Sequence, residues 1–358
     1  VVLMQIFNRP TRVSFVSCPL FKLPKAQYIW SMRVAIGGAS GLLGTLLTEA
    51  LTRRGDQVIR LVRRQEKLPD ERQWNPDAGI ISGPGLDDVD AVVNLAGAPI
   101  AGHRWTPKYK SEIVRSRIAS TQTIVRALQV SHYEEFEDAT TGTHASRFAG
   151  QCKVFLSANA VGYYGYDNGN VLLPESAPPG TGFLANVCEE WQGAASPAAN
   201  LGVQVAFLRT ANVLDNHGGM MKLLRPLYLL GLGGRIGTGY QWVPWITSED
   251  HVRAMLFLLD NPVNAPVNLC APQPVRNKEF VDAYAHSLGR PARIPFPAPL
   301  VSRILTPQMV QETLLASQRA VPDALTELGF QFNQPTYEDA LQWLQDNQSQ
   351  AGQQQADH

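Results

Sequence analysis

Residues that hold metals or disulfides are scarce in this sequence. The 358 residues include four cysteines and seven histidines, and no C-x-x-C, H-x-x-x-H or H-E-x-x-H spacing occurs. Disulfide frameworks and zinc sites need such ligands in a recognisable pattern, so we expect neither of them, and no other metal. Scattered cysteines are typical of a reducing compartment, which favours a cytoplasmic location.

Net charge and long apolar runs are lacking as well. The 31 basic residues balance the 31 acidic ones, so no overall positive field attracts nucleic acid or an anionic membrane. No apolar run reaches the roughly 20 residues that a membrane-spanning helix requires. We therefore expect a chain with no nucleic-acid partner and no membrane span.

The first 31 residues contain no acidic residue and four basic ones, Arg9, Arg12, Lys22 and Lys25. Targeting segments for organelles are poor in acids, so one interpretation is a transit segment and an organelle location. The other is a leader without a targeting role. Both interpretations place residues 1–31 outside the fold.

From Arg33 onward, short apolar runs alternate with amphipathic stretches, which is typical of strand-helix-strand units on a parallel sheet. We predict a Rossmann-type α/β fold, that is, a doubly wound parallel sheet with a smaller C-terminal α/β lobe. The predicted divisions are 1–31 outside the fold, 32–214 for the dinucleotide-binding domain, 215–345 for the substrate lobe and closing domain, and 346–358 for a disordered tail.

A glycine-rich turn stands between the first predicted strand and the first predicted helix. Gly38, Gly41 and Gly44 form G-x-x-G-x-x-G. Glycine at the first two positions lets the backbone approach a pyrophosphate, and the third lets the helix pack on the sheet. We expect dinucleotide contacts from the turn residues Gly38, Ser40, Gly41, Leu42, Leu43 and Gly44.

The end of the second predicted strand, "LVRRQ", indicates which dinucleotide binds. NAD-selective proteins usually place an acid there for the ribose 2′-hydroxyl, whereas this sequence has Arg63 and Arg64 with no acid in reach. Guanidinium groups suit a 2′-phosphate. The sequence therefore predicts NADP(H) as the cofactor.

Seven motifs then carry a resemblance to a family. They are "GGASGLLG", "VVNLAGAPI", "RWTPKYKSEIVRSR", "SANAVGYYG", "FLRTANVL", "GLGGRIGTGYQWVPWI" and "NLCAPQPVRNKEF". In this order they resemble the short-chain dehydrogenase/reductase superfamily, and more narrowly its atypical "epimerase family" branch. "LLASQRAVPDALTELGFQF" is similar to the small closing domain of that branch.

The resemblance implies further contacts with the cofactor. They fall on the fourth- and fifth-strand blocks, the helix between them and the strand-six block: Asn94, Leu95, Ala96, Gly97, Glu112, Arg117, Ser157, Arg209 and Val213. Small residues such as Ala96 and Gly97 at a strand's carboxyl end also allow close approach of a ligand.

The usual catalytic residues of the superfamily are missing. Leu184 and Cys188 stand where a Tyr and a Lys belong, and Asn159 replaces the usual Ser. An amide can hydrogen-bond a substrate oxygen but cannot transfer a proton. For any catalysis, we predict Tyr163 or Tyr164 of "GYYG" as the proton donor, with Asn159 orienting the substrate oxygen.

Two functions remain open from the sequence. One is an NADP(H)-dependent oxidoreductase or epimerase acting on a small carbonyl or hydroxyl compound, with sugar derivatives among the candidates. The other is a non-catalytic NADP(H)-binding regulatory protein, for example in cell or organelle division. For Trp242 and Trp245, the sequence allows either a place in a substrate pocket or packing in the core. It also leaves open whether the protein forms a homodimer.

Overall fold

The computed structural model describes residues 31–101, 103–137, 144–148, 152–216, 218–292 and 305–356. The chain divides into two units, Val1–Trp30 and Ser31–His358. The predicted leader, apart from Ser31, lies outside the described residues.

An eight-stranded sheet forms the centre of this unit, in the order β14-β10-β8-β5-β1-β2-β3-β4. All neighbouring strands are parallel except β3 and β4. The strands are β1 (Arg33–Gly37), β2 (Gln57–Val62), β3 (Glu71–Asn75), β4 (Ile80–Ile81), β5 (Ala91–Asn94), β8 (Val154–Ala160), β10 (Gln204–Thr210) and β14 (Ala265–Leu269). The predicted doubly wound fold is confirmed.

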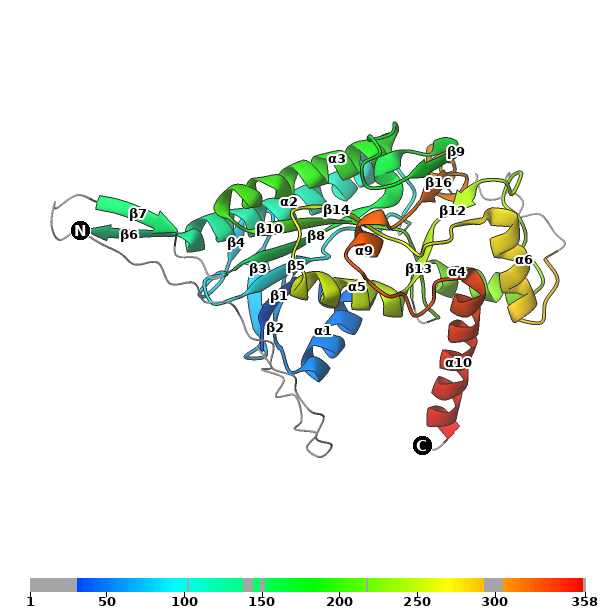
Figure 1. The fold of residues 1–358 in the computed structure, drawn as a ribbon, viewed down its shortest axis with the longest axis horizontal. Helices are drawn as coiled ribbons and strands as arrows, with labels where there is room; N and C mark the ends of the chain where they lie inside the picture. Colours follow the sequence, from blue (N-terminus) through cyan, green and yellow to red (C-terminus); the bar gives the residue numbers. More distant parts are fainter. Residues whose placement is uncertain are drawn as a thin grey trace, which may run out of the picture. The chain divides into compact units, whose positions relative to one another are not determined.

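Helices cover both faces of the sheet (Figure 1). Helices α1 (Leu42–Arg54) and α5 (Ser248–Asp260) cover one face, and α2 (Pro107–His132) and α3 (Phe183–Ala195) cover the other. Leu47 and Leu51, one helical turn apart, bury the inner side of α1 against Ile36 of β1. With both faces covered, β1 consists almost entirely of buried residues, as a central parallel strand should.

The remaining elements follow or interrupt this framework. They are β6 (Tyr133–Glu137), β7 (His144–Phe148), η1 (Val161–Tyr164), β9 (Asp167–Leu173), η2 (Ser196–Leu201), β11 (Asn212–Leu214), α4 (Gly219–Leu229), β12 (Trp242–Val243), β13 (Trp245–Thr247), β15 (Val275–Arg276), α6 (Asn277–Ser287), α8 (Pro307–Met309), η3 (Val310–Leu314), β16 (Ser317–Ala320), α9 (Asp323–Glu327) and α10 (Tyr337–Ala356).

The part of the chain after β11 serves both the sheet and the lobe. Helix α5 and strand β14 complete the central sheet and its covering layer. A separate cluster of buried side chains joins α4, α6 and α10, and it includes Tyr228, Phe280 and Tyr337. Helix α10 continues to Ala356, so residues 346–356 are helical where the sequence predicted a disordered tail.

Candidate nucleotide and substrate site

A tight turn joins β1 to α1, and its glycines are needed for different reasons. Gly38 has a φ of +81°, and a Cβ there would lie 2.8 Å from the carbonyl carbon of Leu95. A Cβ on Gly44 would lie 2.2 Å from the carbonyl oxygen of Gly38, so α1 packs directly on the turn. A Cβ on Gly41 would meet only that oxygen, at 3.4 Å. Gly41 therefore borders open space, as close approach of a ligand requires.

The N-terminus of α1 opens onto the same space. Gly41 is its N-cap, no side chain accepts a hydrogen bond at this cap, and the first turn contains no acidic residue. The leading N–H groups of a helix carry a partial positive charge. This end of α1 is therefore suited to bind an anion.

Two cavities meet at this turn. The first, called here the arginine cleft, has a volume of about 680 Å³ and four arginines in its wall. The second, called the apolar cavity, has a volume of about 620 Å³ and mostly hydrocarbon side chains in its wall. Residues that border both are Gly38, Gly41 and Leu95.

The structure brings many of the predicted cofactor residues together at these cavities. The arginine cleft is lined by Gly38, Ser40, Gly41, Arg63, Arg64, Leu95, Ala96, Gly97 and Glu112. The apolar cavity is lined by Leu42, Leu43, Gly44, Arg117 and Val213, together with Asn159 of the predicted catalytic set. Neither of these two linings includes Asn94, Ser157, Arg209, Tyr163 or Tyr164.

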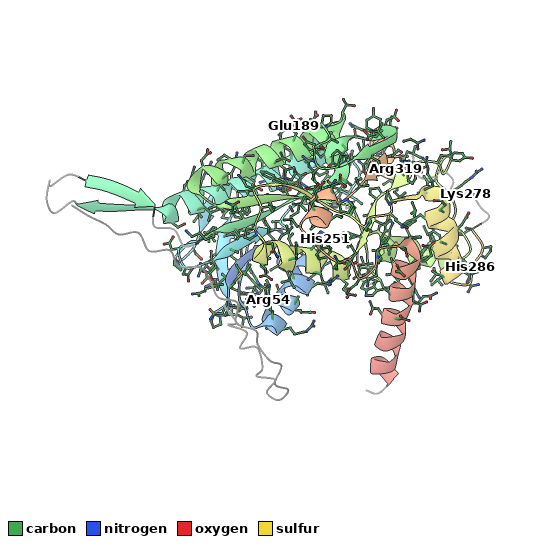
Figure 2. All side chains as sticks on the ribbon, in the orientation of Figure 1. Arg54, Glu189, His251, Lys278, His286 and Arg319 are labelled. Atoms are coloured by element: carbon green, nitrogen blue, oxygen red, sulfur yellow. The ribbon has the colours of Figure 1, made fainter. Side chains whose placement is uncertain are left out.

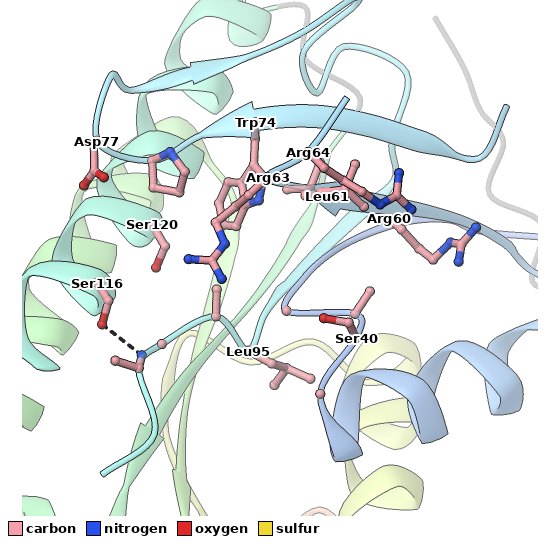
Figure 3. A pocket seen from close by; sticks show the side chains of 18 of the residues that line it. Ser40, Arg60, Leu61, Arg63, Arg64, Trp74, Asp77, Leu95, Ser116 and Ser120 are labelled. Atoms are coloured by element: carbon pink, nitrogen blue, oxygen red, sulfur yellow. Dashed lines mark hydrogen bonds between the residues drawn. The ribbon is translucent and has the colours of Figure 1, made fainter. Parts of the chain in front are cut away.

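The expectation that no acid reaches the arginine pair is wrong for Arg64. Its guanidinium donates to both carboxylate oxygens of Glu71, at 2.8 and 2.6 Å, and this contact lowers the pKa of Glu71 to about 2. Glu71 lies on β3, seven residues further along the chain, and the sequence pattern gave no sign that β3 pairs with β2. In Figure 3, Arg63 points into the cleft, whereas Arg64 points away from it.

The other two arginines of the cleft also have carboxylate partners. Arg60 donates to both oxygens of Asp70, at 3.0 and 2.9 Å. Arg115 is paired with Glu112 and Asp77. Among the described residues, Arg63 has no hydrogen bond or ion pair with the protein, so its guanidinium is the cation of this cleft that is available to a ligand.

Two of the predicted cofactor residues, Asn94 and Ser157, are buried in the protein and do not line the cleft. Asn94 is fully buried; its side-chain oxygen accepts from the Ala96 amide at 3.2 Å and its side-chain nitrogen donates to Thr121 at 3.1 Å. Asn94 therefore shapes the loop that lines the cleft. Ser157 lies opposite Asn94 on β8 and is equally enclosed.

Arg209 and Tyr164 belong to a buried network beside the apolar cavity. Arg209 donates to the Tyr164 hydroxyl at 2.9 Å, and that hydroxyl donates to Asn268 at 2.7 Å. Burial raises the pKa of Tyr164 to about 12. The Arg209 guanidinium also lies 3.6 Å from the centre of the Tyr163 ring. These contacts hold the Tyr164 hydroxyl and the Arg209 guanidinium within the protein, whereas Tyr163 is held through its ring face.

Asn159 has polar partners within the protein. Its side-chain nitrogen donates to the Cys188 carbonyl at 2.9 Å, and its oxygen accepts from the Ala160 amide at 2.8 Å. These bonds fix the end of β8 to α3. Burial raises the pKa of the Cys188 thiol to about 11, so this cysteine is not a reactive thiolate.

The two tryptophans that the sequence left open have different places. Trp242 lines the apolar cavity and is partly exposed. Trp245 is fully buried and donates to the Gln273 carbonyl at 3.0 Å. Trp245 is therefore a core residue.

Sequence reasoning missed several polar residues of the apolar cavity. They are Thr210, Tyr228, Asn277, Glu312 and Gln318. Thr210 ends β10 and contacts the ring of His251 at 3.0 Å, and Glu312 comes from a segment more than a hundred residues after β10. The carboxyl end of "FLRT" could have indicated Thr210, because ligands of such sheets bind there. Nothing in the local pattern indicated Tyr228 or Glu312.

Two known family models match parts of this chain. A model described as the NAD dependent epimerase/dehydratase family matches residues 34–270. The chain belongs to this family. A second model, Domain of unknown function (DUF1731), matches residues 296–344 and corresponds to the predicted closing domain. The resemblance drawn from the motifs is thus confirmed.

Similar proteins come from bacteria, plants and animals. "Epimerase family protein Mb2239" of Mycobacterium bovis is 40% identical over 86% of this chain and 96% of its own length. "Epimerase family protein SDR39U1 homolog, chloroplastic" of Arabidopsis thaliana is 33% identical over 87% of this chain and 86% of its own. A crystal structure of human epimerase family protein SDR39U1 (isoform2) with NADPH has a TM-score of 0.75 and 29% identity, and it covers 88% of this chain and 100% of that one.

Among the helices of the described residues, none combines the length and the apolar character needed to cross a membrane.

Proposed function

We propose that this protein binds NADP(H) in the arginine cleft and catalyses oxidation or reduction of a small carbonyl or hydroxyl compound in the apolar cavity. The observation that carries the choice of cofactor is Arg63, the cleft arginine without a protein partner. The similarity to a human protein whose structure was solved with NADPH supports the same cofactor.

The residues present fit a dinucleotide. Open space beside Gly41 and the uncapped start of α1 suit a pyrophosphate. Arg63 would hold the 2′-phosphate, and the small residues Ala96 and Gly97 would admit the ribose and base. Bound NADP(H) supplies or accepts a hydride. The apolar cavity adjoins the turn and would keep water away from the substrate carbon.

The proton donor is a separate question. Tyr163 and Tyr164 stay a prediction in this role, and the contacts of Tyr164 disfavour it, because its hydroxyl is already held by Arg209 and Asn268. Turnover of Tyr163→Phe, measured beside NADPH affinity, tests the remaining phenol. Full activity of that variant would return Tyr163 to a packing role.

A non-catalytic, NADP(H)-binding regulatory role is the second candidate. Its supporting observation is that Leu184 and Cys188 line the apolar cavity at the positions of the missing Tyr and Lys. Neither side chain can exchange a proton near neutral pH, since Cys188 has a raised pKa.

Labelled cofactor distinguishes the two candidates. The protein would be incubated with NADPH carrying deuterium at the transferable position and with a panel of aldehydes and ketones. An oxidoreductase transfers deuterium to one face of a carbonyl carbon, which mass spectrometry and NMR detect in the alcohol. Tight NADPH binding with no transfer to any member would favour the regulatory role.

A further inference from the structure

The apolar cavity has two charged side chains in its described wall, Arg117 and Glu312. Arg117 is buried, and one of its terminal nitrogens donates to the carbonyls of Ala98 and Ile113, both at 3.0 Å. Its guanidinium lies 5.0 Å from the centre of the Trp191 ring. Two backbone carbonyls and an aromatic ring thus hold this guanidinium at the cavity wall.

Glu312 is held by contacts within the protein as well. Its carboxylate accepts from the amides of Phe183 and Leu184 at 3.0 and 2.8 Å, and from the Gln308 side chain at 2.8 Å. These amides belong to the first turn of α3, so Glu312 caps that helix. An anionic cap on a helix N-terminus is already well compensated.

Most neutral polar side chains of the wall are also paired within the protein. Asn159 bonds Cys188 and Ala160, the Asn277 oxygen accepts from the Ile236 amide at 2.9 Å, and Gln318 donates to the Gly165 carbonyl. Thr210 contacts His251 at 3.0 Å. The rest of the wall is hydrocarbon, from side chains such as Met220, Leu224, Val243, Phe280 and Leu314.

Two further arginines contact Trp242, which belongs to this wall. The guanidiniums of Arg276 and Arg319 lie 3.8 and 4.5 Å from the centre of the Trp242 ring, and Arg276 also bonds Asn170 and the Tyr240 carbonyl. Neither arginine lines the cavity.

We propose that the substrate of this cavity is an uncharged ketone, aldehyde or corresponding alcohol with an aliphatic or aromatic body, and that nucleoside diphosphate sugars are excluded. A diphosphate brought into this cavity would lose its hydration and meet a single arginine already held by backbone carbonyls, together with the carboxylate of Glu312, and such an uncompensated burial of charge costs several kcal/mol. A hydrocarbon body gains affinity from the apolar wall. This inference rests on the proposed function and specifies its substrate class.

Ligand binding to the NADPH complex tests this substrate class. The wild-type protein is saturated with NADPH, and saturation-transfer NMR then measures the binding of 2-decalone, 4-phenyl-2-butanone, UDP-glucose and glucose 6-phosphate. We expect transfer to both ketones and none to the two phosphate compounds. Binding of UDP-glucose as tight as that of the ketones would overturn the proposal, as would failure of both ketones to bind.

A matched pair of variants locates the ketone. Leu224 lines the cavity on α4, whereas Leu230 at the end of the same helix is 73% exposed. Leu224→Arg should weaken ketone binding at least tenfold, and Leu230→Arg should leave it unchanged. Equal ketone affinities in the two variants would place the ketone outside the cavity and contradict the inference.

Failure of the proposed function has a different signature. If NADPH does not bind, the cofactor assignment fails, while ketone binding to the free protein and its sensitivity to Leu224→Arg still report on the cavity. If NADPH binds and UDP-glucose also binds in a way that Arg319→Ala abolishes, the substrate class is wrong and the cofactor assignment stands.

Discussion

The arginine cleft and the apolar cavity share the border formed by Gly38, Gly41 and Leu95, yet their walls have opposite character. The cleft contains four arginines, three of them paired with carboxylates and one, Arg63, available to a ligand. The cavity has one arginine, which is bonded to backbone carbonyls. Among the described residues, the lining arginine without a protein partner thus lies on one side of the glycine turn.

The two walls also differ in how the chain builds them. The cleft is assembled from segments between Gly38 and Ser120, mostly from loops that follow consecutive parallel strands. The cavity combines the same turn with residues of β8, β10, α4 and α6 and with the segment around Glu312, about 270 residues further along the chain. Family membership therefore says more about the cleft than about the cavity.

The largest change in stability is expected in the glycine turn, where the cleft and the cavity meet. Gly44→Ala places a methyl group 2.2 Å from the Gly38 carbonyl oxygen, and relief of such a clash should reduce the free energy of unfolding by about 3 kcal/mol. Gly41→Ala should change stability by less than about 1 kcal/mol and weaken NADPH binding at least tenfold. Urea unfolding and NADPH titration of both variants measure this.

Two results would contradict these different roles of Gly41 and Gly44. A Gly41→Ala protein that keeps full NADPH affinity would show that no ligand approaches the open side of the turn. A fully stable Gly44→Ala protein would show that α1 can move away from the turn without loss.

How far the sequence predicts this molecule depends on how local the determinants are. The strands at Arg33–Gly37 and Gln57–Val62 and the helix after the glycine turn followed from apolar periodicity and from Gly55, which ends α1 in the left-handed region. The prediction that residues near the glycines share one site came from the same local pattern, and several of these residues line the arginine cleft. That they contact a cofactor stays a prediction.

The rest depends on contacts between distant segments. The pairing of Arg64 with Glu71 requires β3 beside β2, and the burial of Tyr164 requires Asn268 of β14. Glu312 reaches α3 across more than a hundred residues. Arg64 and Glu71 are only seven residues apart, but nothing in that stretch indicates that β3 lies beside β2. The partners of the other two contacts are more than a hundred residues apart, and most of the cavity is built in this way.

A smaller change in stability is expected from His251, which contacts Thr210 of the apolar cavity. His251 of α5 is fully buried, and burial lowers its pKa to about 3. The unfolded chain binds this proton below its ordinary pKa of about 6.5 and the folded chain does not, so stability present above pH 6.5 is lost as the pH falls towards 3. The loss attributable to His251 should reach about 2 kcal/mol at pH 5.

Unfolding of His251→Gln in urea at pH 7 and pH 5 checks this effect. His286→Gln is the matched control, since His286 is exposed on α6; both histidines are labelled in Figure 2. The first variant should lose less stability on acidification than the wild type, and the second should follow the wild type. Parallel pH curves for all three proteins would contradict a dry, apolar interior on this side.

The smallest effect concerns the second charge of the apolar cavity. Glu312→Gln keeps a side-chain oxygen near the α3 amides but removes the charge, so stability should fall by about 1 kcal/mol. Glu327→Gln, at an exposed position of α9, should have no measurable effect. Thermal unfolding of both variants distinguishes a carboxylate that caps a helix from one that has no partner. A Glu312→Gln protein with the same thermal stability as the wild type would contradict the capping role.

The most direct test of the central claim is the ratio of NADH to NADPH dissociation constants, measured by cofactor fluorescence, in the wild type, Arg63→Ala and Arg53→Ala. Arg53 is exposed on α1 and does not line the cleft, so its variant controls for net charge. Arg63→Ala loses a charged contact with the 2′-phosphate, which should weaken NADPH binding by about 1.5–3 kcal/mol. Its affinity for NADH should stay unchanged. Arg53→Ala should keep the wild-type preference for NADPH. Equal affinities for the two cofactors in the wild type, or an unchanged ratio in Arg63→Ala, would contradict the account.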